Sequence, residues 1–559
     1  MFKKLLTHPI FWIFLLALVL RLYNLSEVPY GFHADEARVG WNAYSILKTG
    51  ADDWGNKFTL HYNTFGDFRP TGYFYLTIPS LLIFGVNEFA VRFPGALAGS
   101  LTVVSLYFLL SKLSPKNPNS NVQGPISPAI LGALLLSLSP WHISLSRATS
   151  EGVVAIFLAL TGLIFLLRLL NSSKNPLLPF VLALLFLLSS YFFYHSARLL
   201  VPLLVAATTL YILWPQLKNH KPALFVCVIL FAATFLFSLN PAARGRFNQV
   251  GIFTDLDVKY ELDKMPFDEG PNKVFIARLF HNKPSVYARR FINEYTQYIS
   301  SKFFLVPKEA KPGRYQTVGM GILTYVEFGL LILGLVAIAQ KKPFTTPLVL
   351  LLLLLSPLPG ALTTEDAPNL HRSAFMIPFL ASVEAFGLYG VFKIKKKPKL
   401  ITSFVIIALT LNFIFFWHQY FTHNKVGNTL SRNIGAKELG IRLSQLAPEY
   451  SSVLVTNIPD SPYPWVAFFG KLDPKTFNEM ASIRDKGVWS YNNLTFTSTR
   501  CPSRDAFNTQ TPLPGKILVV DAEACETEAG KYNYGEAVKI KEQIKRPDDT
   551  VVYTIWARE

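Results

Sequence analysis

The chain has 559 residues, of which 51% are hydrophobic, and its mean hydropathy is +0.30. These values exclude an ordinary soluble enzyme of this length and indicate a membrane protein with several spans. The formal net charge of +18 would suggest nucleic acid binding in a soluble chain, but most basic residues fall between apolar runs. That distribution is typical of cytoplasmic loops and lipid headgroup contacts, so we expect no nucleic acid partner.

Eleven stretches qualify or nearly qualify as membrane spans, which need roughly 20 mostly apolar residues. We expect these spans at residues 9–25, 91–111, 126–143, 151–170, 176–193, 197–214, 222–239, 318–339, 345–361, 372–392 and 400–421. The first is followed by Arg21-Leu-Tyr-Asn24 and not by small residues, which indicates an uncleaved helix and not a signal peptide.

The loops between these spans alternate in charge, as the positive-inside rule requires. The basic residues on one side are Lys3, Lys4, Lys112, Lys116, Arg168, Lys174, Lys218, Lys221, Lys341, Lys342 and the run 393–399. We expect that side, with the N-terminus, to be the cytoplasm. The loops 26–90 and 240–317 and the C-terminal tail then lie outside.

The first outer loop contains two candidate surface helices. A span at Thr71 to Val86 would reverse every later loop, so we expect an interfacial or re-entrant helix there. The amphipathic stretch from Asp35 to Lys48 predicts a second one. Asp35 lies near its N-terminus, where the helix dipole stabilises an ionised carboxylate.

The tail is less apolar and carries short β-branched runs, which predicts a small α/β domain over residues 426–559. The expected elements are strands at Ser452–Thr456, Ile517–Val520 and Val551–Ile555 and a helix at Ala436–Leu446. Cys501 and Cys525 either form a disulfide, which needs an oxidising compartment, or are both free, and the sequence favours neither.

The first outer loop opens with Gly31-Phe-His-Ala-Asp35-Glu36-Ala-Arg38. Acidic residues beside a membrane segment are usually functional when they face a cavity. The structural alternative is a helix cap with a solvated Glu36 beside it, and the residues alone do not decide between the two. Aromatic and polar side chains between Asp52 and Arg69 are of the kinds that line sugar sites.

Cationic side chains are expected at the same outer level, where guanidinium groups suit a phosphate ligand. The candidates are Arg69, Arg147, His195, Arg198, His371 and Arg372. The alternative for Arg147 is a helical ion pair with Glu151, and for Arg372 an interfacial anchor. We predict no metal site from the sequence, although a divalent ion stays open as a cofactor.

In order along the chain, several short motifs resemble the family-39-like glycosyltransferases. They are Asp35-Glu36, Arg69-Pro70 before a surface helix, Phe93-Pro-Gly-Ala-Leu97, Tyr298-Ile-Ser-Ser-Lys-Phe-Phe-Leu305 followed by Pro312-Gly-Arg314, and His371-Arg372. The family includes the dolichyl-phosphate-mannose protein mannosyltransferases and the aminoarabinose lipid A transferase, which share the GT-C fold. The resemblance covers roughly residues 10 to 420 in layout.

The resemblance implies a polytopic GT-C membrane domain over residues 1–425. The tail over residues 426–559, which we expect to be an extracytoplasmic α/β domain, resembles the family only loosely, and the resemblance therefore does not fix the acceptor. The resemblance also implies transfer of a sugar from a polyprenyl-phosphate donor to a hydroxyl of a protein, lipid or cell-envelope glycan at the outer face. Asp35 would be the base, with Glu36 as its motif neighbour, and Arg198 and Arg372 would hold the phosphate. One carboxylate base and no carboxylate nucleophile indicate inversion.

Two other functions stay open at this stage. A lipid or sugar transporter or flippase would also have many spans, and it predicts charges inside them and repeated halves. A sensor or adhesion protein would bind its ligand through the tail and leave Asp35 and Glu36 dispensable.

Overall fold

The computed structural model describes most of the chain. The described residues are 6–64, 67–113, 126–171, 176–213, 221–239, 248–270, 273–306, 313–341, 346–364, 367–394, 398–458, 460–480, 487–507, 515–525 and 534–559. Several residues named above lie outside these ranges, namely Lys3, Lys4, Lys116, Lys174, Lys218, Pro312, Lys342 and residues 395–397. The cytoplasmic placement of the basic loops therefore stays a prediction.

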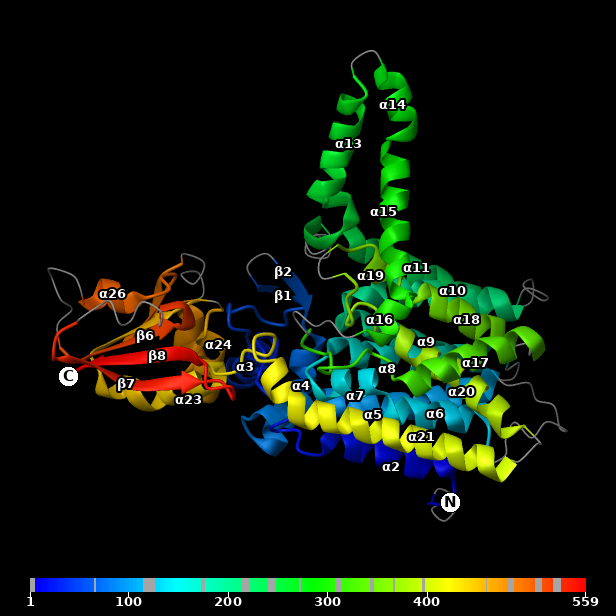
Figure 1. Ribbon diagram of the computed structural model, residues 1–559, viewed down its shortest axis with the longest axis horizontal. Helices are drawn as coiled ribbons and strands as arrows, with labels where there is room; N and C mark the ends of the chain where they lie inside the picture. The colour runs from blue at the N-terminus through cyan, green and yellow to red at the C-terminus, as the bar shows by residue number, and fades with distance from the viewer. Residues whose placement is uncertain are drawn as a thin grey trace.

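Every predicted span coincides with a helix or a pair of helices. They are α2 (Pro9–Leu22), α5 (Glu88–Leu113), α6 (Pro128–Leu138), α7 (Pro140–Arg147), α8 (Glu151–Asn171), α9 (Leu177–Ser189), α10 (His195–Leu213), α11 (Lys221–Leu239), α17 (Tyr325–Lys341), α18 (Thr346–Leu355), α19 (Leu358–Ala361), α20 (Met376–Phe392) and α21 (Pro398–His418). In Figure 1 the long helices α2, α5 and α21 run in one general direction, and the C-terminal sheet lies beyond one end of them.

The expected number of eleven spans is not confirmed. Among the described residues, three helices are long and apolar enough to cross a membrane, at Glu88–Leu113, Glu151–Leu170 and Pro398–Gly427. The pair α6 and α7 makes a fourth if it counts as one span, although it is bent by 56°. The bend falls at Pro140, which lacks the backbone N–H that a continuous helix would use. The other apolar helices have 10–17 residues.

One predicted span begins later than expected. The stretch 318–339 becomes helical only at Tyr325, because Thr324 and Glu327 cap the start of α17. Glu327 accepts hydrogen bonds from the backbone N–H of Thr324 (2.8 Å) and from its hydroxyl (2.6 Å). This Thr-x-x-Glu pattern is a capping box, which marks a helix N-terminus.

Small residues let the helices approach closely, as is usual for helices packed in lipid. A Cβ atom on Gly334 of α17 would lie 2.0 Å from the carbonyl oxygen of Val383 in α20. A Cβ atom on Gly387 of α20 would lie 2.2 Å from the carbonyl oxygen of Leu330. The two backbones are therefore in direct contact, and a larger residue at either glycine would force them apart.

The first outer loop contains the two expected helices and a short hairpin that the sequence analysis missed. The elements are α3 (Ala34–Thr49), β1 (His61–Thr64), β2 (Asp67–Pro70) and α4 (Gly72–Phe84). His33 caps α3, because its Nδ1 accepts from the Asp35 N–H (3.0 Å) while Glu36 accepts from the His33 N–H (3.0 Å). This capping box fixes where α3 begins, and therefore where Asp35 lies.

The second outer loop forms a helical arm that projects away from the body (Figure 1). Its helices are α13 (Leu256–Asp268), α14 (Val274–Phe280) and α15 (Lys283–Tyr298), followed by the short α16 (Ser301–Leu305). The arm is tied to the body at its base, where the Asn369 N–H donates to the Tyr298 hydroxyl (2.9 Å).

The tail contains a six-stranded mixed sheet in the order β4-β5-β3-β6-β8-β7. Its strands are β3 (Ser452–Thr456), β4 (Trp489–Tyr491), β5 (Leu494–Thr497), β6 (Ile517–Ala522), β7 (Val538–Lys545) and β8 (Val551–Arg558), and its first helix is α23 (Ala436–Leu446). The three predicted strands and the helix are confirmed. Cys501 and Cys525 form a disulfide. The domain boundary at residue 425 stays a prediction.

Helix α24 (Tyr463–Phe469) joins the tail to the start of α3. Trp465 donates its indole N–H to the Phe32 carbonyl (2.6 Å). The Phe32 ring lies 5.8 Å from that of Phe468 and 5.6 Å from that of Phe469, measured between centroids. A Cβ atom on Gly40 of α3 would lie 2.8 Å from the Phe468 ring. The tail therefore packs directly on the segment that carries Asp35.

Candidate active site

Asp35 lies in a centre where residues from separate parts of the chain meet. Its Oδ1 is 2.6 Å from Arg69 Nη1 on β2 and 3.7 Å from Arg38 Nη1, one turn further along α3. Its Oδ2 pairs with Arg314, which lies just before α17. Only 12% of the Asp35 side chain is exposed, against 36% for Arg69 and 22% for Arg314. The carboxylate is thus nearly buried among guanidinium groups that solvent still reaches.

The arginines lower the pKa of Asp35 well below its usual range. Burial alone would raise this pKa, but the charges of Arg69 and Arg314 outweigh it. His33 adjoins the pair, since its Nδ1 accepts from Arg314 Nη1 (3.0 Å). Burial and the Arg314 charge lower the pKa of His33 to about 3, so the imidazole is neutral at pH 7. In this state Asp35 is an ionised carboxylate with little tendency to take a proton.

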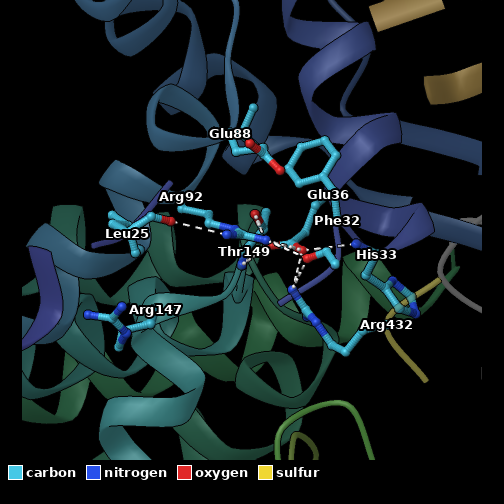
Figure 2. A network of polar contacts seen from close by, with 12 residues as sticks. Leu25, Phe32, His33, Glu36, Glu88, Arg92, Arg147, Thr149 and Arg432 are labelled. Carbon is cyan, nitrogen blue, oxygen red and sulfur yellow. Dashed lines mark hydrogen bonds and ion pairs between the residues drawn. The ribbon is translucent and has the colours of Figure 1, made fainter. Parts of the chain in front are cut away.

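Glu36 lies in a second network that is fully buried (Figure 2). Its Oε1 accepts from Arg92 Nε (3.1 Å) and from the backbone N–H of Thr149 (3.2 Å). Its Oε2 accepts from Arg432 Nη2 (2.5 Å) and from the His33 N–H (3.0 Å). Burial opposes ionisation, yet Arg432 and Arg92 lower the pKa of Glu36 to about 2.

The Glu36 network joins four parts of the chain. Arg92 belongs to α5, Thr149 to the turn before α8, and Arg432 to the segment leading into the tail. Arg92 also donates to the carbonyl oxygens of Leu25 (3.1 Å) and Gly31 (2.7 Å). Both carboxylate oxygens are therefore engaged, so Glu36 holds the outer loop against the helices and the tail.

His371 lies beside the Asp35 centre. Its ring is 5.2 Å from that of Tyr315 and 4.5 Å from that of Tyr194. Its Nε2 accepts from Ser150 Oγ (3.0 Å) and from the Gly152 N–H (3.3 Å). Burial and the nearby Arg314 charge lower the pKa of His371 well below its usual value, so it is a neutral group in this site.

Arg372 follows His371 in the same loop. Its Nη1 donates to Thr363 Oγ1 (2.9 Å), and its backbone N–H donates to Asn369 Oδ1 (3.0 Å). Asn369 Oδ1 also accepts from the His371 N–H (3.0 Å), so one amide fixes both residues. Among the described contacts, Arg372 is linked to the Asp35 centre through its neighbour His371.

His195 and Arg198, at the start of α10, contact the hairpin that carries Arg69. His195 Nε2 donates to the Phe68 carbonyl (2.7 Å), and Arg198 Nη2 donates to His61 Nε2 (2.8 Å). Phe68 directly precedes Arg69, while His61 lies on the paired strand. These two residues therefore support the position of Arg69, and the described contacts do not join them to Asp35.

Arg147 lies apart from both networks, and Figure 2 shows it to one side of Glu36. Its Nη1 donates to the Leu20 carbonyl (2.8 Å) and its Nη2 to the Val28 carbonyl (2.8 Å). The alternative for Arg147, a helical ion pair with Glu151, is also not among its described contacts, since Arg147 ends α7 and Glu151 begins α8. The guanidinium is used to cap carbonyl groups at the end of α2.

A small polar cavity adjoins the centre on the side of Arg314 and Tyr315. It is lined by Pro29, Tyr30, Ser144, Arg314, Tyr315, Gln316, Tyr420, Asn424, Asn428 and Arg432. Asn428 is buried, and its side-chain oxygen has no hydrogen-bond partner among the described residues. Amide and tyrosine groups of this kind can bind hydroxyl groups of a ligand. The described part of the chain contains no group of three or more His, Cys, Asp or Glu side chains that could hold a metal ion.

Sequence reasoning missed Arg314, the closest cationic partner of Asp35 in the centre, together with Arg38, Arg92 and Arg432. Arg314 and Arg38 stand inside motifs that had been noticed, and Arg92 directly precedes Phe93 of another. A search for cations within those motifs or directly beside them would have found these three. Arg432 had no such signal, because it lies between the last span and the tail, where nothing marks it.

The helical block, the long loop that carries the acidic centre and the C-terminal sheet have the arrangement of the GT-C fold, as comparison with solved structures shows. The whole chain is similar to ArnT from Cupriavidus metallidurans bound to undecaprenyl phosphate, with 13% identity, a TM-score of 0.52 and 98% of each chain covered. It is also similar to the oligosaccharyltransferase AglB from Archaeoglobus fulgidus in complex with an inhibitory peptide and a dolichol-phosphate. There the identity is 13% and the TM-score 0.50, over 94% of this chain and 70% of that one. No protein-family model and no curated protein sequence matches the chain.

Proposed function

We propose that the protein is a membrane glycosyltransferase that moves a sugar from a polyprenyl-phosphate donor to an acceptor hydroxyl at the outer face of the cell membrane. The observation that carries this proposal is Asp35, held between Arg69 and Arg314 at the start of α3. A carboxylate beside guanidinium groups supplies both parts of the reaction, a base for the acceptor and positive charge for the phosphate. The proposal is supported by the GT-C fold and by two similar structures, one bound to undecaprenyl phosphate and one in complex with a dolichol-phosphate.

The donor phosphate is expected to compete with Asp35 for its arginines. Guanidinium groups bind phosphate and carboxylate through the same paired N–H donors. When the donor phosphate takes over Arg69 and Arg314, Asp35 loses the charges that lower its pKa and becomes a stronger base. The base would therefore become active only when the donor is bound.

The proposed transfer is a direct displacement at the anomeric carbon of the sugar. Asp35 takes the proton of the acceptor hydroxyl while the acceptor oxygen bonds to the anomeric carbon of the sugar. The bond between that carbon and the phosphate oxygen breaks, and its electron pair leaves with the lipid phosphate. The phosphate gains negative charge in this step, which Arg69 and Arg314 stabilise. One displacement inverts the anomeric configuration.

The other predicted site residues take supporting roles in this proposal. Glu36 positions α3, while His195 and Arg198 position the hairpin of Arg69. His371 and Arg372 border the centre and are our candidates for contacts with the donor headgroup. Arg147 is the weakest candidate, because main-chain carbonyls occupy its guanidinium.

The outer location of the site is part of the proposal. The disulfide between Cys501 and Cys525 favours an oxidising compartment for the tail. Since the tail packs on Phe32 beside the site, the two must lie on the same side of the membrane. We therefore place the N-terminus in the cytoplasm and both the Asp35 centre and the tail outside.

A transporter or flippase is the second candidate, and one observation favours it. Glu327 and Glu384 are buried within the apolar helices α17 and α20, and carboxylates at membrane depth often mark transport paths. Glu327, however, is engaged as a helix cap with Thr324. A flippase without transferase activity would move the lipid but form no new glycosidic bond.

The test is transfer of a labelled sugar from a polyprenyl-phosphate donor by the purified protein in lipid vesicles. We expect Asp35→Asn to lower the rate by a factor on the order of 100 or more, as for loss of a general base. Asp505→Asn, on the exposed side of a tail helix, is the matched control and should keep the parent rate. Transfer by Asp35→Asn at the parent rate would exclude Asp35 as the base.

A further inference from the structure

The helical arm of the second outer loop carries an unusual amount of exposed apolar surface. In α14, five large apolar side chains are exposed, namely Val274, Phe275, Ile276, Leu279 and Phe280. Phe275 is 84% exposed and Phe280 is 66% exposed. Exposed apolar patches of this kind mark a surface that binds a lipid or a protein.

The arm does not need these side chains to hold its own helices together. Along α13, α14 and the start of α15 the inner contacts are made by small or branched residues, namely Val258, Ala277 and Val286, while Glu294 and Tyr298 are buried nearer the base of the arm. Ion pairs close the hairpin, with Arg290 Nη2 3.2 Å from Asp255 Oδ2 and Arg289 paired with Glu261. The apolar side of α14 is therefore available for a partner.

The direction of the arm suits the membrane surface. In Figure 1 the arm lies across the direction of α2, α5 and α21. If those helices cross the bilayer, the arm lies along its plane. The same view shows α13 on the side of the C-terminal sheet, and α14 and α15 on the side of the helical block. The side that carries α14 then faces the lipid.

The charges on the arm agree with this orientation. Helix α13, on the side of the tail, is acidic on balance, with Asp257, Glu261, Asp263 and Asp268 against Lys259 and Lys264. The exposed basic residues Lys273, Arg278 and Lys283 flank the apolar side chains of α14. An apolar face bordered by Lys and Arg is typical of helices that lie in the interface of a membrane with anionic lipids.

We propose that the arm lies on the outer leaflet, with α14 inserted among the lipid headgroups and first acyl carbons and its basic residues on anionic phosphates. This proposal rests on the membrane setting and outer location of the proposed function, but not on the transfer reaction. The base of the arm is tied through Tyr298 to Asn369, the amide that fixes His371 and Arg372. The arm would thus fix the depth of the candidate donor site relative to the outer surface of the bilayer.

The test uses the full-length protein in lipid nanodiscs, with Cys227→Ser to remove the free cysteine. An environment-sensitive fluorophore is attached at Phe275→Cys, or at Asp263→Cys on α13 as the matched control. Nitroxide groups on the lipid acyl chains should quench the label at 275 several-fold more than the label at 263. Leaving out phosphatidylglycerol from phosphatidylcholine discs should weaken quenching at 275.

Two results would overturn the proposal. Equal, weak quenching at 275 and 263 would mean that α14 is in water. A label at 275 that is shielded from water but not quenched by lipid nitroxides would mean that a protein, such as a second copy, covers α14. The same quenching is expected in the Asp35→Asn protein, so failure of the proposed reaction and failure of the arm proposal can be told apart.

Discussion

Replacing Glu36 with Gln tests whether the buried network holds the outer loop in place. Glu36 is the carboxylate shared by Arg92 and Arg432, and it is almost wholly buried. Removing one partner from a buried ion pair costs about 3–5 kcal/mol of stability, because the remaining charge is left uncompensated. In Glu36→Gln two guanidinium groups lose their counter-charge at once.

The lowered pKa of Glu36 gives, independently, a similar value for the contribution of Glu36 to the folding free energy. This pKa falls from an ordinary value of 4.5 to about 2 in the folded protein. A change of that size corresponds to about 3 kcal/mol of folding free energy. Because the folded pKa is the lower one, this stabilisation is complete above about pH 4.5 and is lost as the pH falls towards 2.

The assay is thermal unfolding of the purified protein in nanodiscs, from pH 7 down to pH 3. We expect Glu36→Gln to unfold a few degrees below the parent at pH 7, with the difference starting to shrink only below about pH 4.5. Glu542→Gln is the control, since Glu542 pairs with Arg442 (2.6 Å) where both side chains are partly exposed, and such pairs contribute little. Equal losses in the two variants, or a difference that is constant down to pH 3, would refute the reasoning.

Three further predictions concern Arg314 in the Asp35 centre, Arg147 beside α2, and the disulfide of the tail. Arg314→Gln should lower transfer by a factor on the order of 100, since it removes charge from the leaving phosphate, without lowering the unfolding temperature as Glu36→Gln does. Arg147→Gln should show the reverse, a lower unfolding temperature with an unchanged donor KM, because its partners are carbonyl groups. Changing both Cys501 and Cys525 to Ser should destabilise the tail by about 3 kcal/mol, seen as earlier proteolysis of the tail, because their disulfide closes a short loop.

The helices could be predicted from the sequence because each needs only a local pattern, an apolar run of sufficient length. The errors lie where a proline or a helix cap interrupts such a run. Pro140 divides one predicted span into α6 and α7, and Thr324 with Glu327 delays the start of α17. In the tail, strands with continuous apolar runs were found, whereas β7 was missed because lysines and glutamate alternate along it as an exposed edge strand.

The candidate site could be predicted only in part, since its members come from five separate places in the chain. Asp35 and Arg69 were found because a motif marked each of them. Arg314 and Arg432 approach the same helix turn from sequence distances of 279 and 396 residues. No periodicity links such positions, so only the packing of the loop, the helices and the tail brings them together.

Two adjacent carboxylates can have different roles because successive side chains of a helix point about 100° apart. Asp35 points to the hairpin and to Arg314, where all its contacts are side chains that remain partly open to solvent. Glu36 points to the helical block and to the tail, where two backbone N–H groups and two buried arginines occupy both its oxygens. In the proposed reaction a donor phosphate draws Arg69 and Arg314 away from Asp35, whereas Arg92 and Arg432 are almost wholly buried and stay with Glu36. We therefore expect the same turn of α3 to offer one carboxylate that exchanges partners with a substrate and one that fixes the first in place.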